Sequence, residues 1–176
     1  MQEEKVILVD PIKCTGCHSC EMACSMKNFG KCSPSLSRIR IIEFREINTF
    51  IPIVCQGCKD APCLKVCPVG AITRSLSGAV VIDQDTCIGC RACMYVCPQS
   101  APVVNPENGK LMTCDLCEGE KEPWCVKACT MQGALRLVPK YQTIARKGKE
   151  DFAWKIKEEF KPKIKEEEKV EGFSFG

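Results

Sequence analysis

The stretch Cys87-Ile-Gly-Cys90-Arg-Ala-Cys93-Met-Tyr-Val-Cys97-Pro98 decides the fold of this chain. Three cysteines lie close together, a fourth follows one helical turn later, and a proline ends the run. Three more runs also open with C-x2-C and close with C-x3-C. They are Cys14, Cys17, Cys20, Cys24; Cys55, Cys58, Cys63, Cys67; and Cys114, Cys117, Cys125, Cys129. The four runs use all but one of the 17 cysteines.

Cysteines at this spacing indicate iron–sulfur clusters, because thiolates are soft ligands that select such clusters or zinc. C-x2-C-x2-C-x3-C-P is the run of bacterial ferredoxins, in which the fourth cysteine ligates the other cluster of a pair. The first run differs from it only at Ser25. The fourth cysteine lies about 6 Å further along a helix and therefore reaches the neighbouring cluster. Gly16, Gly57 and Gly89 let the loops fold closely around each cluster. We expect paired runs that hold two clusters near each other, as electron transfer requires.

Two alternatives use the same residues differently. Structural zinc sites usually pair two C-x2-C units separated by 12 or more residues, whereas these runs concentrate their cysteines in short segments. A disulfide framework belongs to exported proteins. The first eleven residues contain no signal peptide, and no apolar stretch is long enough to cross a bilayer. We therefore expect a soluble, cytoplasmic protein with reduced thiols and no direct membrane insertion.

Composition limits the function further. Aromatic residues make up 6% of the chain, so the apolar core is small and metal ligation supplies much of the folding energy. The formal net charge of +3 treats each cysteine as neutral. Four oxidised clusters with their thiolates bring it to about −5, so we expect no nucleic-acid partner. The chain has one histidine and no nucleotide-binding motif, and we expect no catalytic residues.

The remaining pattern predicts an α+β fold of short strands, β-hairpins and short helices. Extended segments are expected at residues 6–9, 38–44, 49–54, 71–74, 79–82, 103–104, 111–112 and 134–138, and a helix in the second half of each run. Residues 1–139 form the four-cluster domain. Residues 140–176 form a charged C-terminal extension, either solvated or an arm that binds a partner through Trp154, Phe160, Phe173 and Phe175.

Three other residues are singled out by their positions. Cys32 belongs to no run and is expected to be a buried or free thiol. His18 lies between two ligands of the first run, where packing against the cluster is favoured over tuning its potential. Trp124 precedes Cys125 and is expected to shield a cluster from water.

Residues 5–139 resemble the iron–sulfur electron-transfer subunits of molybdopterin and tungstopterin oxidoreductases. The segments that carry the resemblance are the third run, Cys55-Gln-Gly-Cys58-Lys-Asp-Ala-Pro-Cys63-Leu-Lys-Val-Cys67-Pro, and Thr113-Cys114-Asp-Leu-Cys117 with Pro123-Trp-Cys125-Val-Lys-Ala-Cys129. The resemblance implies two interleaved bacterial ferredoxin-like modules, one from runs one and four and one from runs two and three. It implies four [4Fe–4S] clusters.

The resemblance also implies a ligand set for each cluster. Cluster 1 has Cys14, Cys17, Cys20 and Cys129; cluster 2 has Cys24, Cys114, Cys117 and Cys125; cluster 3 has Cys55, Cys58, Cys63 and Cys97; cluster 4 has Cys67, Cys87, Cys90 and Cys93.

The implied function is a non-catalytic subunit that relays electrons between a catalytic oxidoreductase subunit and a carrier such as ferredoxin. The compact chain and its charged extension favour a tungsten or molybdenum pterin aldehyde oxidoreductase as the partner, in a heterodimer or larger complex of a thermophilic anaerobe. The alternatives are a free polyferredoxin, a partner of a hydrogenase or carbon monoxide dehydrogenase, and a redox enzyme in its own right.

Overall fold

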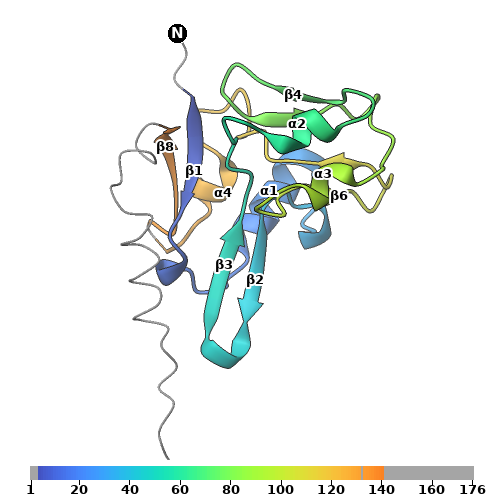
Figure 1. The fold of residues 1–176 in the computed structure, drawn as a ribbon. Helices are drawn as coiled ribbons and strands as arrows, with labels where there is room; N and C mark the ends of the chain where they lie inside the picture. Colours follow the sequence, from blue (N-terminus) through green and yellow to red (C-terminus); the bar gives the residue numbers. More distant parts are fainter. Residues whose placement is uncertain (1–3, 132, 141–176) are drawn as a thin grey trace, which may run out of the picture. The chain divides into compact units, whose positions relative to one another are not determined.

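A computed structural model describes residues 4–131 and 133–140 (Figure 1). Nearly all of the C-terminal extension, with Trp154, Phe160, Phe173 and Phe175, lies outside the described residues. None of the helices in the described part of the chain is long and apolar enough to span a membrane.

The strands of the described residues form four antiparallel pairs. The pairs are β1 (Lys5–Val9) with β8 (Leu135–Pro139), β2 (Arg40–Phe44) with β3 (Thr49–Ile53), β4 (Ile72–Arg74) with β5 (Val80–Ile82), and β6 (Val103–Val104) with β7 (Leu111–Met112). Three are the expected hairpins. The β1–β8 pair joins the two ends of the domain, with Ile7 opposite Leu137 (Figure 1).

Each cysteine run contributes one helix, as expected. The helices are α1 (Ser19–Phe29), α2 (Pro62–Val66), α3 (Ala92–Tyr95) and α4 (Trp124–Lys127), with short 3-10 turns at Pro11–Lys13, Pro34–Leu36 and Arg45–Ile47. Helix α1 packs against α4, and α2 packs against α3. Runs one and four therefore share one module, and runs two and three share the other.

The helices of the last three runs are shorter than the spacing predicted. Among the last cysteines of the four runs, only Cys24 lies inside a helix. The other three lie just beyond the ends of their helices: Cys67, Cys97 and Cys129. Pro68 and Pro98 explain two of these early ends, because proline disfavours helical geometry in the residue before it. The first run has Ser25 in place of proline, so α1 continues to Phe29 and ends at a left-handed glycine.

The cysteines form part of the small core. One cluster of buried side chains joins Ile7 and Ile39 with Cys20, Cys24, Cys114 and Cys125. A second joins Val80 and Leu111 with Cys87 and Cys93. Because much of each core is thiol, the packing of both modules depends on what those thiols bind.

Candidate iron–sulfur sites

Three cavities are each lined by four cysteines. One has Cys14, Cys17, Cys20 and Cys129, another Cys55, Cys58, Cys63 and Cys97, and a third Cys67, Cys87, Cys90 and Cys93. Each cavity takes three thiols from one run and the fourth from the last position of its partner run. The structure thus brings together the residues that the sequence analysis grouped as ligands of clusters 1, 3 and 4.

The remaining four cysteines of the runs also gather, in the buried interior. Cys24, Cys114, Cys117 and Cys125 are all buried. Burial raises the pKa of Cys125 well above its ordinary value, and the Cys114 and Cys24 thiols beside it raise it further. These side chains are therefore close neighbours in space, although the second and third runs separate Cys24 from the rest in the sequence.

The loop that carries the first two cysteines shares one unusual backbone feature in every run. The third residue of C-x2-C has a positive φ: 69° at Gly16, 53° at Gly57, 71° at Gly89 and 58° at Leu116. Glycine adopts this conformation readily, whereas leucine rarely does. The sequence analysis identified the three glycines and missed Leu116, since nothing in a leucine indicates a left-handed residue.

Backbone amides point at several of the cysteine sulfurs. Arg38 N–H donates to Cys24 Sγ, Ala101 N–H to Cys97 Sγ and Leu116 N–H to Cys114 Sγ, each at 3.4 Å. Such donors stabilise a thiolate more than a thiol. When a metal is bound, these N–H groups would offset part of the negative charge on the ligating sulfurs.

Burial alone would keep many of these thiols neutral. It is the main cause that raises the pKa of Cys20 to about 12 and that of Cys93 to about 11. A thiolate in such surroundings needs a positive partner, and metal binding supplies one as the proton leaves. Four soft donors around one apolar cavity fit a [4Fe–4S] cluster, which would exchange single electrons there. The ligand sets themselves remain predictions.

A buried carboxylate holds the first run against the β2–β3 hairpin. Glu21 on α1 accepts a hydrogen bond from Ile41 N–H at 2.8 Å and lies 2.7 Å from His18 Nδ1. His18 Nε2 lies 2.9 Å from the carboxylate of Glu43 on β2. The hydrogen bond to Glu21 is the main cause that raises the pKa of His18. The structure thus gives the single histidine a role in joining α1 to the hairpin.

A single arginine braces the loop of the second run. The Arg74 guanidinium donates to the carbonyl oxygens of Gly57 at 3.2 Å, Gly78 at 3.1 Å and Cys58. Its planar fork suits several acceptors at once, which a lysine cannot match. Arg74 was not expected from the sequence, because its acceptors are backbone carbonyl groups, which no side-chain pattern marks.

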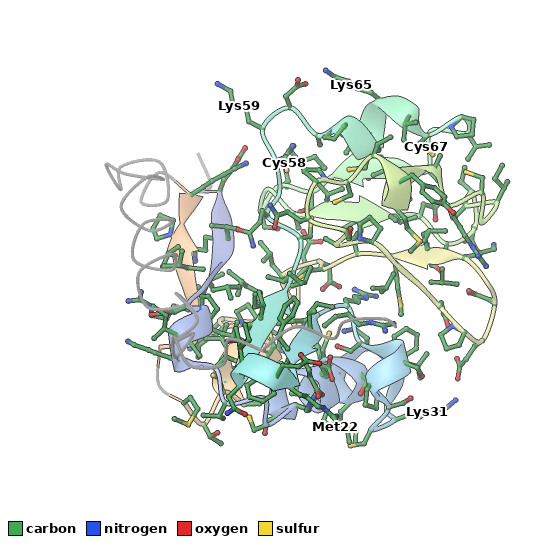
Figure 2. All side chains as sticks on the ribbon, turned by 60° about the horizontal axis from the view of Figure 1, so that its bottom comes forward. Met22, Lys31, Cys58, Lys59, Lys65 and Cys67 are labelled. Atoms are coloured by element: carbon green, nitrogen blue, oxygen red, sulfur yellow. The ribbon has the colours of Figure 1, made fainter. Side chains whose placement is uncertain are left out.

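Two lysines lie on the surface near the second run. Figure 2 shows Lys59 and Lys65 pointing outward from the segment that also holds Cys58 and Cys67. Both lysines are exposed, and Lys65 pairs with Asp60 at 2.5 Å.

Other candidate residues lie away from the four-cysteine groups. Cys32 is an exposed free thiol rather than a buried one. Trp124 is partly buried, with Lys27 Nζ 5.8 Å from the centre of its ring. Shielding of a cluster by Trp124 remains a prediction.

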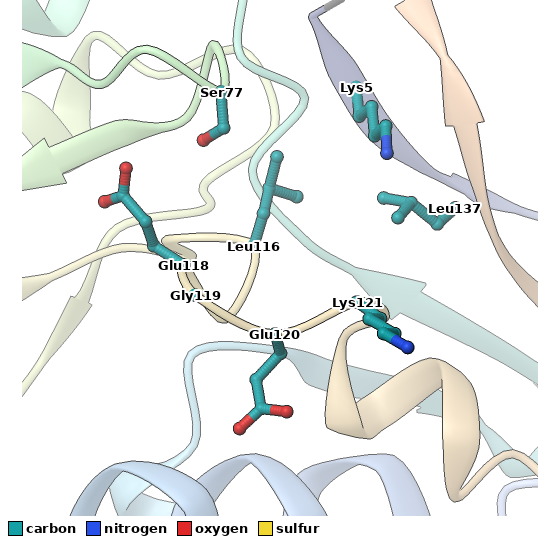
Figure 3. Close-up of a pocket in the computed structure, with 8 residues that line it drawn as sticks. All are labelled: Lys5, Ser77, Leu116, Glu118, Gly119, Glu120, Lys121 and Leu137. Carbon is teal, nitrogen blue, oxygen red and sulfur yellow. The ribbon is translucent and has the colours of Figure 1, made fainter. Parts of the chain in front are cut away.

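A separate open pocket lies beside the fourth run (Figure 3). Its described lining mixes charged and apolar residues: Lys5, Ser77, Leu116, Glu118, Gly119, Glu120, Lys121 and Leu137. Cysteine is not among these described residues.

The fold and the four-thiol sites define an iron–sulfur protein of the ferredoxin type, and comparison with known proteins gives its family. Residues 47–138 match the model of the 4Fe-4S dicluster domain, and this protein belongs to that family. Its relatives are non-catalytic electron-transfer subunits with iron–sulfur clusters. The expected ferredoxin-like fold, its short strands, hairpins and helices, and the cofactor of four [4Fe–4S] clusters are confirmed.

Two relatives illustrate the match. The protein is 39% identical over 168 residues to the polyferredoxin-like subunit of an aliphatic sulfonate oxidoreductase from Pyrococcus furiosus, covering 89% of this protein and 95% of the relative. It is 38% identical over 143 residues to a subunit of the anaerobic dimethyl sulfoxide reductase of Escherichia coli, covering 70% and 68%. Among solved structures, a subunit of the BamBC active site complex of benzoyl coenzyme A reductase aligns with a TM-score of 0.48 and 24% identity, covering 89% and 90%.

Proposed function

We propose that this chain is the electron-transfer subunit of a pterin oxidoreductase complex. It passes single electrons through four [4Fe–4S] clusters between a catalytic subunit and an external carrier such as ferredoxin. The ligand sets given in the sequence analysis hold the clusters, residues 1–139 form the cluster domain, and residues 140–176 serve as a partner-binding arm.

The order in which the four-cysteine groups adjoin one another supports this proposal. Burial is the main cause that raises the pKa of Cys114 in the second group, and the nearby Cys55 thiol of the third group also raises it. In the same way, the nearby Cys20 thiol of the first group raises the pKa of Cys125, and the nearby Cys63 thiol raises the pKa of Cys93. The groups therefore follow one another as 1, 2, 3 and 4.

The two ends of this series reach the surface. Cys17 in the first group and Cys90 in the fourth are exposed, whereas every cysteine of the second group is buried. Electrons can therefore enter at one end and leave at the other, while the interior group is protected from water. A relay needs this arrangement, and an enzyme with its own substrate does not.

The nature of the catalytic partner is the finer part of the proposal. The compact chain and charged extension favour a tungsten or molybdenum pterin aldehyde oxidoreductase in the cytoplasm of a thermophilic anaerobe. The 39% identity to a subunit of an aliphatic sulfonate oxidoreductase supports a second candidate, a sulfonate-oxidising partner.

Anaerobic purification of the tagged chain from its own cells tests the proposal. A catalytic subunit containing tungsten or molybdenum should accompany it in stoichiometric amount. A chain that purifies alone with its clusters intact would indicate a free polyferredoxin, and a nickel-containing partner would indicate a hydrogenase or carbon monoxide dehydrogenase.

The role of the C-terminal extension has its own test. Removal of residues 141–176 should weaken the complex while leaving the iron content unchanged. The matched control is an extension of the same length and composition with shuffled order. Equal association of all three forms would reject the arm.

A further inference from the structure

The loops at the two exposed ends have the same backbone and can be compared position by position. Gly16 and Gly89 have φ values of 69° and 71°, and the residues before α1 and α3, His18 and Arg91, have φ values of 57° and 63°. Each loop presents one exposed cysteine to the surface. Runs one and three are therefore structural equivalents, and so are the last cysteines of runs four and two that complete their groups.

The chemistry around the two exposed cysteines is opposite at three equivalent positions. At these positions the sequence has three hydroxyl side chains in the site that includes Cys17 and three apolar ones in the site that includes Cys90. The equivalent pairs are Thr15 with Ile88, Ser19 with Ala92, and Thr130 with Pro68.

Two of the hydroxyl side chains lie at the Cys17 site. Thr130 Oγ1 lies 3.9 Å from Cys17 Sγ, and Thr15 lines the same cavity. Ser19 begins α1, two positions after Cys17. Ile88 and Ala92 line the cavity at Cys90, and their side chains have no hydrogen-bond donor. Pro68 lacks even a backbone N–H.

We propose that Thr15, Ser19 and Thr130 are positioning residues that raise the reduction potential of the site at Cys17 above that of the site at Cys90. Hydrogen bonds to cysteine sulfur stabilise the extra negative charge of the reduced state and so favour reduction. Hydroxyl donors to a charged acceptor form the stronger class of hydrogen bond. Exposure to water does not distinguish the two sites, because both have an exposed thiol.

The inference rests on the proposed ligand sets and gives the proposed relay a polarity. Electrons at equilibrium gather at the Cys17 end, and the Cys90 end holds them more weakly. The Cys90 end is therefore the donor side of the relay and the Cys17 end is the acceptor side.

The test is a redox titration of the full holo chain, followed by electron paramagnetic resonance. The variant Thr15→Val/Ser19→Ala/Thr130→Val should move one reduction step to lower potential and leave the others in place. A roughly tenfold change in the ratio of reduced to oxidised site is expected, equivalent to about 59 mV for a one-electron couple. The reciprocal variant Ala92→Ser should move a different step to higher potential. Thr73→Val, at an exposed position on β4, is the matched control and should move none.

Iron content separates the possible failures. Four unchanged steps in both tuning variants, with all iron retained, would overturn the inference, and so would an equal shift in Thr73→Val. If the triple variant loses iron, Thr130→Val alone and Ala92→Ser decide by the same criteria. Absence of four clusters from the wild-type chain would instead contradict the proposed function.

Discussion

A methyl group added at Gly16 should destabilise the first cluster loop. Gly16 has a φ of 69°, and a Cβ built on it would lie 2.5 Å from Cδ1 of Phe50. Phe50 cannot easily retreat, because it pairs with Glu43 across the β2–β3 ladder and packs against the core of its module. The change Gly16→Ala therefore combines backbone strain with a steric clash.

The control Gly30→Ala separates these two effects. Gly30 has a φ of 66°, and nothing lies within 4 Å of its added Cβ. A left-handed conformation costs a residue other than glycine about 1–2 kcal/mol. Overpacking adds about 1–3 kcal/mol. We expect Gly16→Ala to lose the sum of both terms, about 2–5 kcal/mol, and Gly30→Ala to lose only the first.

Loss of the visible absorbance of the clusters in anaerobic guanidinium measures the difference. Because release of the clusters makes unfolding irreversible, rates are compared rather than equilibrium constants. If the strain of the variant is already relieved in the transition state for unfolding, each 1.4 kcal/mol of destabilisation speeds cluster loss about tenfold. Gly16→Ala should lose its clusters at least roughly tenfold faster than Gly30→Ala. Equal rates would refute the reasoning that Phe50 closes over the loop.

Three further changes give distinct outcomes. Glu21→Ala leaves His18 and the Ile41 N–H without their buried acceptor and should lower stability by about 1–3 kcal/mol. The control is Glu46→Ala at an exposed position, and equal unfolding rates of the two variants would show that Glu21 does not hold α1 to the hairpin. Arg74→Lys loses the fork that holds the loop of the second run and should release about four of the irons to a chelator faster than wild type; identical release kinetics would reject the brace. Cys32→Ser should keep all its iron and lose one thiol that reacts with an alkylating agent in the native protein, whereas lost iron would place Cys32 among the ligands.

The sequence predicted the elements of this fold well because ligand spacing constrains the chain strongly. The C-x3-C spacing located the four α-helices of the described residues, and paired apolar segments separated by turn residues located three hairpins. The strand at residues 134–138 was also expected. Its pairing with β1 depends on a contact between the two ends of the domain, which local pattern does not reveal.

The residues that sequence reasoning missed act through distant or backbone contacts. Leu116 takes a left-handed conformation because the loop of the fourth run repeats the geometry that glycine supplies elsewhere. Glu21 looks like an ordinary surface charge of a helix, yet it is 4% exposed because β2 covers it. The early ends of α2 and α3 go with the proline after the last cysteine of each run, whereas α4 also ends early although Thr130 follows Cys129, so the spacing of the cysteines alone overestimates helix length.

The iron, acid-labile sulfide and zinc of the anaerobically purified chain test the central claim most directly. Four [4Fe–4S] clusters predict about sixteen iron and about sixteen sulfide per chain, with negligible zinc. About eight of each, or zinc in stoichiometric amount, would contradict a four-cluster relay.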